Sequence, residues 1–198
     1  MMLSSTPHRY LSGVTLLEIL IAMSILAIMI TVAMPSLSTF GDNQKLVGLA
    51  EQVFGHLQQA RSEAVTRSET VYANFAVDGT SNWEYGISLN SECVVTETDP
   101  TETDACVIIV DDGDGTDNDA DRVLMRFPST DHDDISMDIA DFSSDTTEFI
   151  FDSVRGTASS GQIELENSSG KQLRINVSRL GRVSICSPDD SIQNYGAC

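Results

Sequence analysis

A run of aspartates near the middle of the chain has the residue types that bind hard cations. Six of the eleven residues from Asp111 to Asp121 are aspartate. Carboxylate oxygens are the ligands that Ca²⁺ prefers, and Asp112 and Asp114 are the candidate ligands. The sequence does not match the pattern of an EF-hand loop, because counting from Asp112 gives no glycine at the sixth position and no glutamate at the twelfth. We therefore expect a polar hairpin loop, with a weak calcium site as the alternative.

A second group of residues that could bind a ligand is a set of basic side chains towards the C-terminus. The set comprises Lys171, Arg174, Arg179 and Arg182. Cations so grouped can neutralise phosphates, and binding to nucleic acid would then fall steeply with salt. The same side chains can equally pair with local carboxylates over a sheet surface, which is the interpretation we favour.

The sequence shows no arrangement that is typical of catalysis. The three histidines, His8, His56 and His132, are far apart, and no serine or cysteine has a nucleophile motif around it. The carboxylates lie mostly in loops, without the apolar surroundings that would shift their pKa values. Zinc is disfavoured too, since the cysteines and histidines are not clustered. We expect no enzymatic activity and no cofactor.

The net charge of −19 comes from one part of the chain. Residues 78–152 hold 21 acidic and 2 basic residues, whereas residues 153–198 hold 4 acidic and 5 basic residues. The middle of the chain therefore repels polyanions and the C-terminal part does not.

Glu18 is the one charged residue in an apolar run that extends from Val14 to Met34. A run of about 20 apolar residues is long enough to cross a bilayer as a helix. A carboxylate inside such a helix costs about 2.5–3.5 kcal/mol near its centre, so it usually has a partner and a role. The sequence predicts a single membrane span with one functional acid.

This N-terminal region resembles the class III signal of prepilins. Gly13 precedes the apolar residue Val14, Glu18 follows four positions later, and Pro35 lies 21 residues after Val14. The resemblance implies that a prepilin peptidase in the inner membrane removes residues 1–13 and methylates the new amino terminus at Val14. Phenylalanine is the usual first mature residue, so Val14 departs slightly from the pattern.

The free amine that cleavage would create gives the Glu18 carboxylate a partner of opposite charge. An ammonium on Val14 and the Glu18 carboxylate of a neighbouring subunit would relieve each other's desolvation inside a helical bundle. We therefore predict that Glu18 sets the register of the subunit in a filament.

The helix is expected to continue beyond the apolar run. Pro35 should kink the helix. After Pro35, apolar residues recur at helical spacing. They are Leu46, Ala50, Val53, Leu57, Ala60 and Ala64. The segment Gly41–Asn43 either softens this helix or starts a new one, with Asp42 or Asn43 as its cap. We expect the apolar stripe to pack on a sheet, with a coiled coil as the alternative.

From Thr70 onward the apolar pattern changes to a period of two, which is typical of strands. Strands are predicted at residues 71–77, 84–89, 107–110, 122–127, 148–152, 162–166, 173–177 and 183–186. The domain organisation is thus a leader (1–13), a transmembrane and amphipathic helix (14–69) and a β-rich head (70–198). The fold class is α+β, with a long N-terminal helix packed on a small antiparallel sheet or sandwich.

The head is similar to the minor pilins and pseudopilins of the GspH/FimT family. The similar segments are Gln58–Ala64, Trp83 with Gly86, Phe151–Gly156 and Ser178–Val183, followed by Cys186 and a terminal cysteine. Residues 90–105 and 128–147 diverge. The resemblance implies a pilin-like fold and a structural role.

The four cysteines would lie outside the cytoplasm, where disulfides persist. Three pairings are open to them. We favour the sequential one, Cys93–Cys106 and Cys186–Cys198, because it closes two short loops.

Taken together, the sequence predicts a minor type IV pilin or type II secretion pseudopilin that acts in assembly initiation or at the filament tip. It would be anchored in the bacterial inner membrane by one span, with its head in the periplasm, and would contact other pilins through the N-terminal helix. The alternative is a DNA-binding competence pilin. Some FimT-like pilins bind DNA through Gly-Arg-x-Arg, but here the motif reads Gly181-Arg182-Val183-Ser184 and lacks the second arginine.

Overall fold

The structure is a computed structural model that describes residues 13–111, 113, 118–140 and 147–198, with the backbone alone for residues 32–38. One helix, α1 (Leu16–Arg67), opens the described chain. Two compact units divide within it: the first ends at Phe40, and the second is Gly41–Cys198. The chain makes no new helix at Asp42 or Asn43, so that alternative was wrong.

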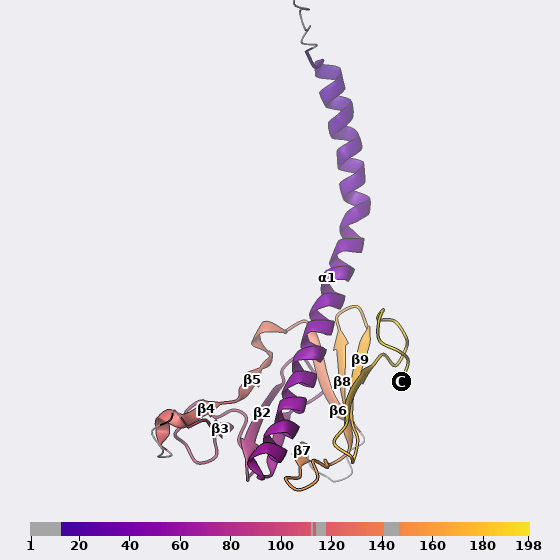
Figure 1. Ribbon diagram of the computed structural model, residues 1–198. Helices are drawn as coiled ribbons and strands as arrows, with labels where there is room; N and C mark the ends of the chain where they lie inside the picture. Colours follow the sequence, from indigo (N-terminus) through magenta and orange to yellow (C-terminus); the bar gives the residue numbers. More distant parts are fainter. Residues whose placement is uncertain (1–12, 112, 114–117, 141–146) are drawn as a thin grey trace, which may run out of the picture. The chain divides into compact units, whose positions relative to one another are not determined.

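The second unit contains the later part of α1 and all the strands (Figure 1). The strands are β1 (Val71–Ala76), β2 (Glu84–Leu89), β3 (Val107–Ile109), β4 (Arg122–Leu124), β5 (Arg126–Pro128), β6 (Ile135–Ala140), β7 (Glu148–Phe151), β8 (Gly161–Asn167), β9 (Gln172–Val177) and β10 (Val183–Cys186). Two short 3₁₀ helices, η1 (Asp119–Asp121) and η2 (Ser129–Asp131), precede β4 and follow β5.

These strands form three antiparallel sheets. The first has the order β5-β2-β1-β7, the second has the order β10-β9-β8-β6, and β3 pairs with β4 alone. In the second sheet β8 alternates strictly between buried and half-buried residues, which places Ile163 and Leu165 on the inner face. The predicted α+β fold class, with a long N-terminal helix and antiparallel sheets, is confirmed.

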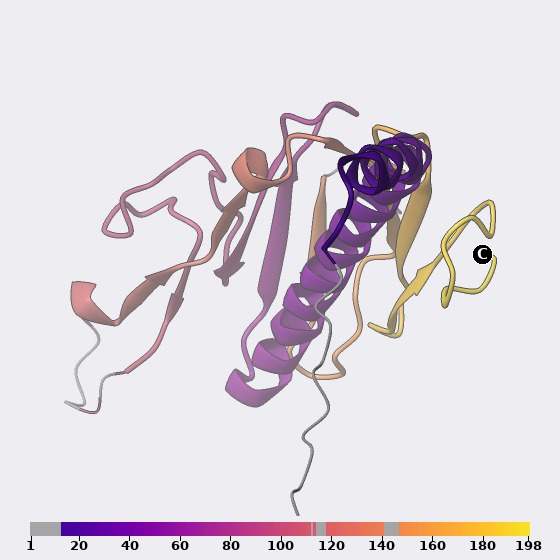
Figure 2. The same ribbon diagram turned by 90° about the horizontal axis from the view of Figure 1, so that it is seen from above.

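The core lies between α1 and the inner faces of the two larger sheets, across which the helix runs (Figure 2). All six residues of the predicted apolar stripe, from Leu46 to Ala64, are at most 2 % exposed. Trp83, Phe149 and Ile163 contribute the sheet side of the same core. Alanines at Ala60 and Ala64 let the helix backbone approach the sheets closely. The helix packs on sheets, so the coiled-coil alternative was wrong.

Two features of the strands differ from the sequence expectation. The strand predicted at 122–127 is two strands, because the chain changes partner at Met125: β4 pairs with β3, and β5 pairs with β2. Strand β6 was missed, although Ile135, Met137 and Ile139 alternate with Ser136 and Asp138 as a half-buried strand does.

The disulfides have the sequential pairing, Cys93–Cys106 and Cys186–Cys198. The first joins the loop after β2 to the start of β3 and lies against Gly86 of β2. A Cβ atom added at Gly86 would stand 2.4 Å from the Cys106 sulfur and 2.7 Å from its Cβ. Only glycine therefore allows the disulfide to pack onto β2 at this point.

We predict that Gly86→Ala destabilises the head by about 1–3 kcal/mol, since the disulfide and backbone beside it cannot move away freely. Gly48→Ala is the control, because an added Cβ there meets nothing within 4 Å. Alanine in an exposed helical position should instead stabilise by about 0.5–1 kcal/mol. Urea unfolding with intact disulfides measures the change in stability of each variant. Equal changes in the two variants would contradict the packing of the disulfide against Gly86.

Candidate functional site

The start of α1 is a capped helix end that carries an acid. The backbone N–H of Glu18 donates to the Thr15 hydroxyl at 3.2 Å, so Thr15 acts as the N-cap and Glu18 is in the first turn. A carboxylate there is stabilised by the positive end of the helix dipole. Sequence reasoning missed this, although Thr-x-x-Glu before an apolar run is a known capping signal.

The apolar side chains after this cap are all exposed in the single chain. Examples are Leu16 at 81 %, Leu17 at 68 % and Ile28 at 65 %. Within the described residues, no helical stretch is both long and apolar enough to cross a membrane. The side chain of Pro35 lies outside the description.

A second site is formed where the last turns of α1 meet two loops of the head. Arg61 donates from Nε to the carbonyl oxygen of Gly156 and from Nη2 to that of Leu180, both at 3.2 Å. These three residues come from the three segments Gln58–Ala64, Phe151–Gly156 and Ser178–Val183. The guanidinium on α1 therefore joins two turns whose accepting carbonyls lie 95 and 119 residues further along the chain.

The two loops that Arg61 holds are tight turns. In the first, the Asp152 carboxylate accepts from the N–H groups of Val154 and Arg155, and Gly156 N–H returns to the Asp152 carbonyl. In the second, Gly181 N–H donates to the carbonyl of Ser178 at 2.8 Å. The loops are also tied to each other, since Ala158 N–H donates to the Arg179 carbonyl.

Glycine is required in the second turn for two reasons. Gly181 has a φ of +70°, and a Cβ there would stand 2.0 Å from the Gly156 carbonyl oxygen. No side chain fits that gap.

The four predicted cations do not form one patch. Arg174 on β9 pairs with Glu164 on β8, with Nη2 and Oε1 2.6 Å apart, and Lys171 donates to the carbonyl of Ser191. Arg179 and Arg182 are exposed in the turn between β9 and β10. Arg182 borders a shallow depression whose other polar lining residues include Gln162, Asn176 and Ser184. The favoured interpretation, pairing with local acids, is therefore right for Arg174.

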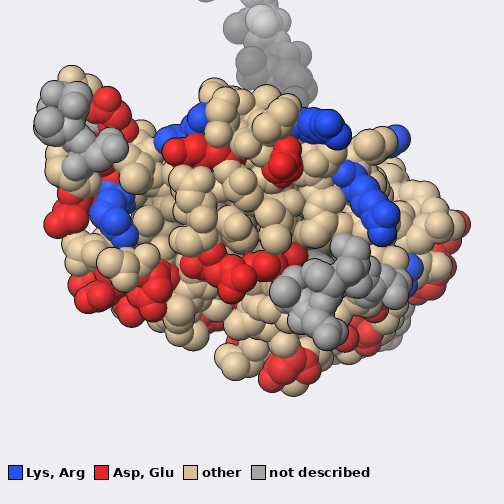
Figure 3. Space-filling model, turned by 90° about the horizontal axis from the view of Figure 1, so that it is seen from below, with Lys and Arg blue, Asp and Glu red and all other residues tan. Residues whose placement is uncertain are grey.

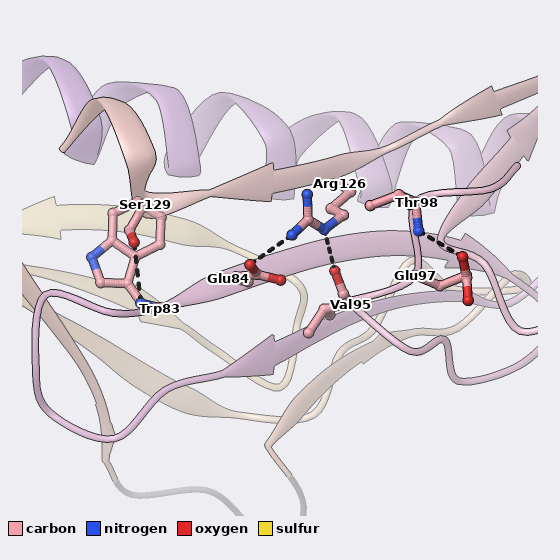
Figure 4. A network of polar contacts seen from close by, with 7 residues as sticks. All are labelled: Trp83, Glu84, Val95, Glu97, Thr98, Arg126 and Ser129. Carbon is pink, nitrogen blue, oxygen red and sulfur yellow. Dashed lines mark hydrogen bonds and ion pairs between the residues drawn. The ribbon is translucent and has the colours of Figure 1, made fainter. Parts of the chain in front are cut away.

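A different arginine, Arg126 on β5, organises the loop that precedes Cys106 (Figure 4). Its Nη2 pairs with Glu84 of β2 at 2.6 Å, and its Nε donates to the Val95 carbonyl at 2.6 Å. Arg122 on β4 donates to the carbonyls of Pro100 and Glu102 in the same loop. The sequence predicted no role for Arg122 and Arg126, because the loop that they contact diverges from the family pattern and lies at a distance from them in the sequence.

The remaining candidates from the sequence are the histidines and the calcium ligands. His56 stacks on Phe127 and lies with Nδ1 2.8 Å from the Tyr85 hydroxyl, and burial lowers the pKa of His56. The calcium candidates Asp112 and Asp114 lie outside the described residues. Elsewhere in the described chain, no group of three acidic, histidine or cysteine residues could hold a metal ion.

One buried acid has an unusual environment. Glu148 on β7 is 6 % exposed and faces a small depression that is also lined by Asn74, Glu92 and Cys93. Burial raises the pKa of Glu148, and the charge of Glu92 and a hydrogen bond to Glu92 raise it further. The protonated form of Glu148 is therefore favoured more than in an exposed glutamate.

Comparison with known families identifies the chain. The sequence model of the family described as type II transport protein GspH matches residues 49–181, about two thirds of the chain. The chain belongs to the GspH family. A second model, the prokaryotic N-terminal methylation motif, matches residues 9–34 of this GspH-family chain. The three segments joined at Arg61 all lie in, or overlap, the matched head region.

Two solved structures of pilin-type proteins are similar to this GspH-family chain. The minor pseudopilin EpsH from the type 2 secretion system of Vibrio cholerae has a TM-score of 0.47 and 10 % identity, and the match covers 73 % of this chain and 98 % of that one. The type IV minor pilin FimU of Pseudomonas aeruginosa has a TM-score of 0.45 and 15 % identity, and the match covers 74 % of this chain and 91 % of that one. No curated protein sequence matches significantly.

We predict that Arg61→Met destabilises this GspH-family head by about 2 kcal/mol, because two charge-assisted hydrogen bonds are lost from a half-buried site. Hydrogen exchange should rise in residues 152–158 and 178–182 together. Arg155→Met is the control, since Arg155 is exposed in the same turn and should change stability by less than about 0.5 kcal/mol. If Arg61→Met left hydrogen exchange in both turns unchanged, the two hydrogen bonds of Arg61 would not stabilise these turns.

Glu148 should make the stability of the GspH-family head depend on pH. A carboxyl whose folded-state pKa is raised stabilises the fold most below its ordinary pKa, and this contribution is lost as pH rises through the raised value. Glu148→Gln should therefore raise the free energy of unfolding at neutral pH and flatten its pH dependence. Glu92→Gln should do so less, because burial is the largest cause of the shift. Urea unfolding between about pH 4 and 8 measures this, and an unchanged profile in Glu148→Gln would refute it.

Proposed function

We propose that this chain is a minor structural subunit of a type II secretion pseudopilus or a type IV pilus, and that it acts in assembly initiation or at the filament tip. The observation that carries the proposal is the combination of a methylation motif over residues 9–34 with a GspH-family head in the same chain. The methylation motif supports a processed N-terminal helix, and the GspH-family head supports a role as a minor subunit.

In this proposal a prepilin peptidase cleaves after Gly13 and methylates Val14. Cleavage leaves an ammonium one residue before the Thr15 cap. Glu18, in the first turn of α1, then pairs with the ammonium of a neighbouring pilin in a helical bundle, and Pro35 belongs to the same assembly segment. The exposed apolar side chains from Leu16 to Ile30 support this, because such side chains can pack on the apolar helices of other subunits.

The proposed location is the bacterial inner membrane, with one span and a periplasmic head, before entry into the filament. Two disulfides in the head support an extracytoplasmic environment, since such bonds are rare in reducing compartments. A structural rather than catalytic role is in keeping with the family.

The alternative function, DNA binding in natural transformation, has less support. Its candidate residues are Lys171, Arg174, Arg179 and Arg182, and two of these are engaged within the head. The two exposed arginines would have to attract a polyanion to a chain with a net charge of −19.

We predict that Glu18→Ala abolishes incorporation into filaments while the protein is still processed to a methylated Val14. Loss of the carboxylate leaves the neighbour's ammonium unpaired in the bundle. The measurements are mass spectrometry of the mature terminus and detection of the subunit in sheared filaments, alongside secretion and piliation assays in the native host.

Thr15→Ala is the matched control for Glu18→Ala. It removes the cap hydrogen bond, worth about 1 kcal/mol, but keeps the carboxylate. Thr15→Ala should therefore still assemble. Equal loss in both variants would assign the effect to the helix end, and a mature terminus elsewhere than Val14 would refute the proposal itself.

A further inference from the structure

Three exposed apolar side chains lie where the two turns held by Arg61 meet α1. Val154, in the first turn, is 84 % exposed, and Leu180, in the second, is 75 % exposed. Val65, in the last turns of α1, is 50 % exposed, and its Cγ2 lies 3.0 Å from a Cβ built at Gly156. Exposed apolar groups that gather in this way are typical of interaction sites.

The backbones that carry these side chains are fixed to one another. The turns touch at Gly156 and Gly181, where an added Cβ would meet the facing carbonyl oxygen at 2.0 Å. Ala158 N–H donates to the Arg179 carbonyl, and Arg61 bonds both turns to α1. The apolar side chains are therefore held in place before any partner binds, and a preorganised surface loses little conformational entropy on binding.

Arginines surround the apolar side chains. Arg155, Arg179 and Arg182 are exposed, and no ion pair with a described residue occupies their guanidinium groups. Residues 153–163 and 175–188 contain no acidic residue, although the chain has 30. In Figure 3, Lys and Arg lie mainly along the upper edge and the right of the head, and Asp and Glu across the middle and the left. We name the surface of Val65, Val154, Leu180, Arg155, Arg179 and Arg182 the turn-tip patch.

A shallow depression of about 420 Å³ adjoins the patch on the second sheet. It is lined by Gln162, Asn176 and Ser184, which lie opposite one another on β8, β9 and β10, and it is bordered by Ser178 and Arg182 at the ends of the second turn. None of its lining residues is acidic. A carboxylate of a partner can therefore enter the depression beside Arg182 without meeting a like charge in its lining.

We propose that the turn-tip patch binds the head of a different pilin-type subunit, which presents an apolar surface to Val154 and Leu180 and a carboxylate to Arg182. An apolar centre with a polar rim is the usual composition of a protein interface, and arginine is enriched at the residues that matter most there. This inference rests on the proposed function, because a minor subunit at a filament tip has other proteins as its neighbours.

The observations favour a protein over a nucleic acid as the occupant. Phosphates would pair with the arginines but would leave Val154 and Leu180 without an apolar surface to pack on. The net charge of −19 also repels a long polyanion. A protein with a few carboxylates beside apolar residues can instead match both parts of the patch.

The test cross-links the full-length chain in its native host. A photoreactive benzophenone amino acid replaces Val154 in the patch and, in a separate variant, the exposed Ile28 in α1. We expect position 154 to cross-link to a different protein with an N-terminal methylation motif, at a segment of its head that has carboxylates beside apolar residues. Mass spectrometry of the cross-linked peptides identifies the partner and the segment.

Charge exchange then tests the contact itself. Arg182→Glu should lower the cross-link yield at position 154 by at least about tenfold, because like charges then face each other. Replacing the carboxylates of the partner's cross-linked segment by lysine should lower the yield with the unchanged chain and restore it with Arg182→Glu. Failure of this exchange to restore the yield would overturn the inference.

Matched variants separate the contact from general effects of charge. Gln44→Glu/Gln52→Glu changes the net charge by the same amount as Arg182→Glu, at exposed positions at least about 20 Å before Val65 along the helix. This control should leave the yield unchanged, whereas Leu180→Ser should lower it about fivefold without a change of charge. All variants should keep both disulfides and the wild-type unfolding midpoint.

Other outcomes would also overturn the inference. They are a cross-link from position 154 to a second copy of this chain alone, a cross-link to a segment without carboxylates, and a duplex DNA fragment that suppresses the cross-link. The Ile28 variant separates this inference from the proposed function. If position 28 cross-links to other pilins and position 154 does not, only the inference fails. If neither position cross-links to a pilin-type protein, the proposed function fails and the inference fails with it.

Discussion

The hydrogen bonds from Arg61 to two backbone carbonyls connect the last turns of α1 to the turns that follow β7 and β9. A guanidinium suits this position because its several N–H donors have a fixed planar geometry and can reach two carbonyls at once. The glycines at 156 and 181 let the turns come close enough to share it. Without that contact, the two turns would lose their shared bond to α1 and would keep only the hydrogen bond from Ala158 N–H to the Arg179 carbonyl between them.

The head thus combines two kinds of stabilisation. An apolar core joins α1 to both larger sheets, whereas the loop between Cys93 and Cys106 has few buried apolar residues and depends on its disulfide and on Arg122 and Arg126. This division is physically reasonable, since a segment with so many carboxylates cannot bury enough apolar surface to fold by itself. A disulfide and arginine-to-carbonyl bonds hold such a segment without a core of its own.

Much of the fold could be predicted because its determinants are local and periodic. Helical spacing gave the stripe from Leu46 to Ala64, and alternation gave most of the strands. The split at Met125 could not be predicted, because a continuous apolar run does not show where a strand changes partner. Of the four cations, the sequence indicated the group but not that Arg174 pairs with Glu164 across β8 and β9.

The sequence by itself determined the N-terminal methylation motif, the family and the α+β class, because these depend on short-range spacing and on motifs that can be read in order. Only the tertiary structure decided that three separate motifs meet at Arg61, that Gly86 makes room for a disulfide, and that Val154 and Leu180 stand exposed among arginines. Such contacts join residues many tens of positions apart, and no local pattern encodes which backbone carbonyl a distant side chain will reach.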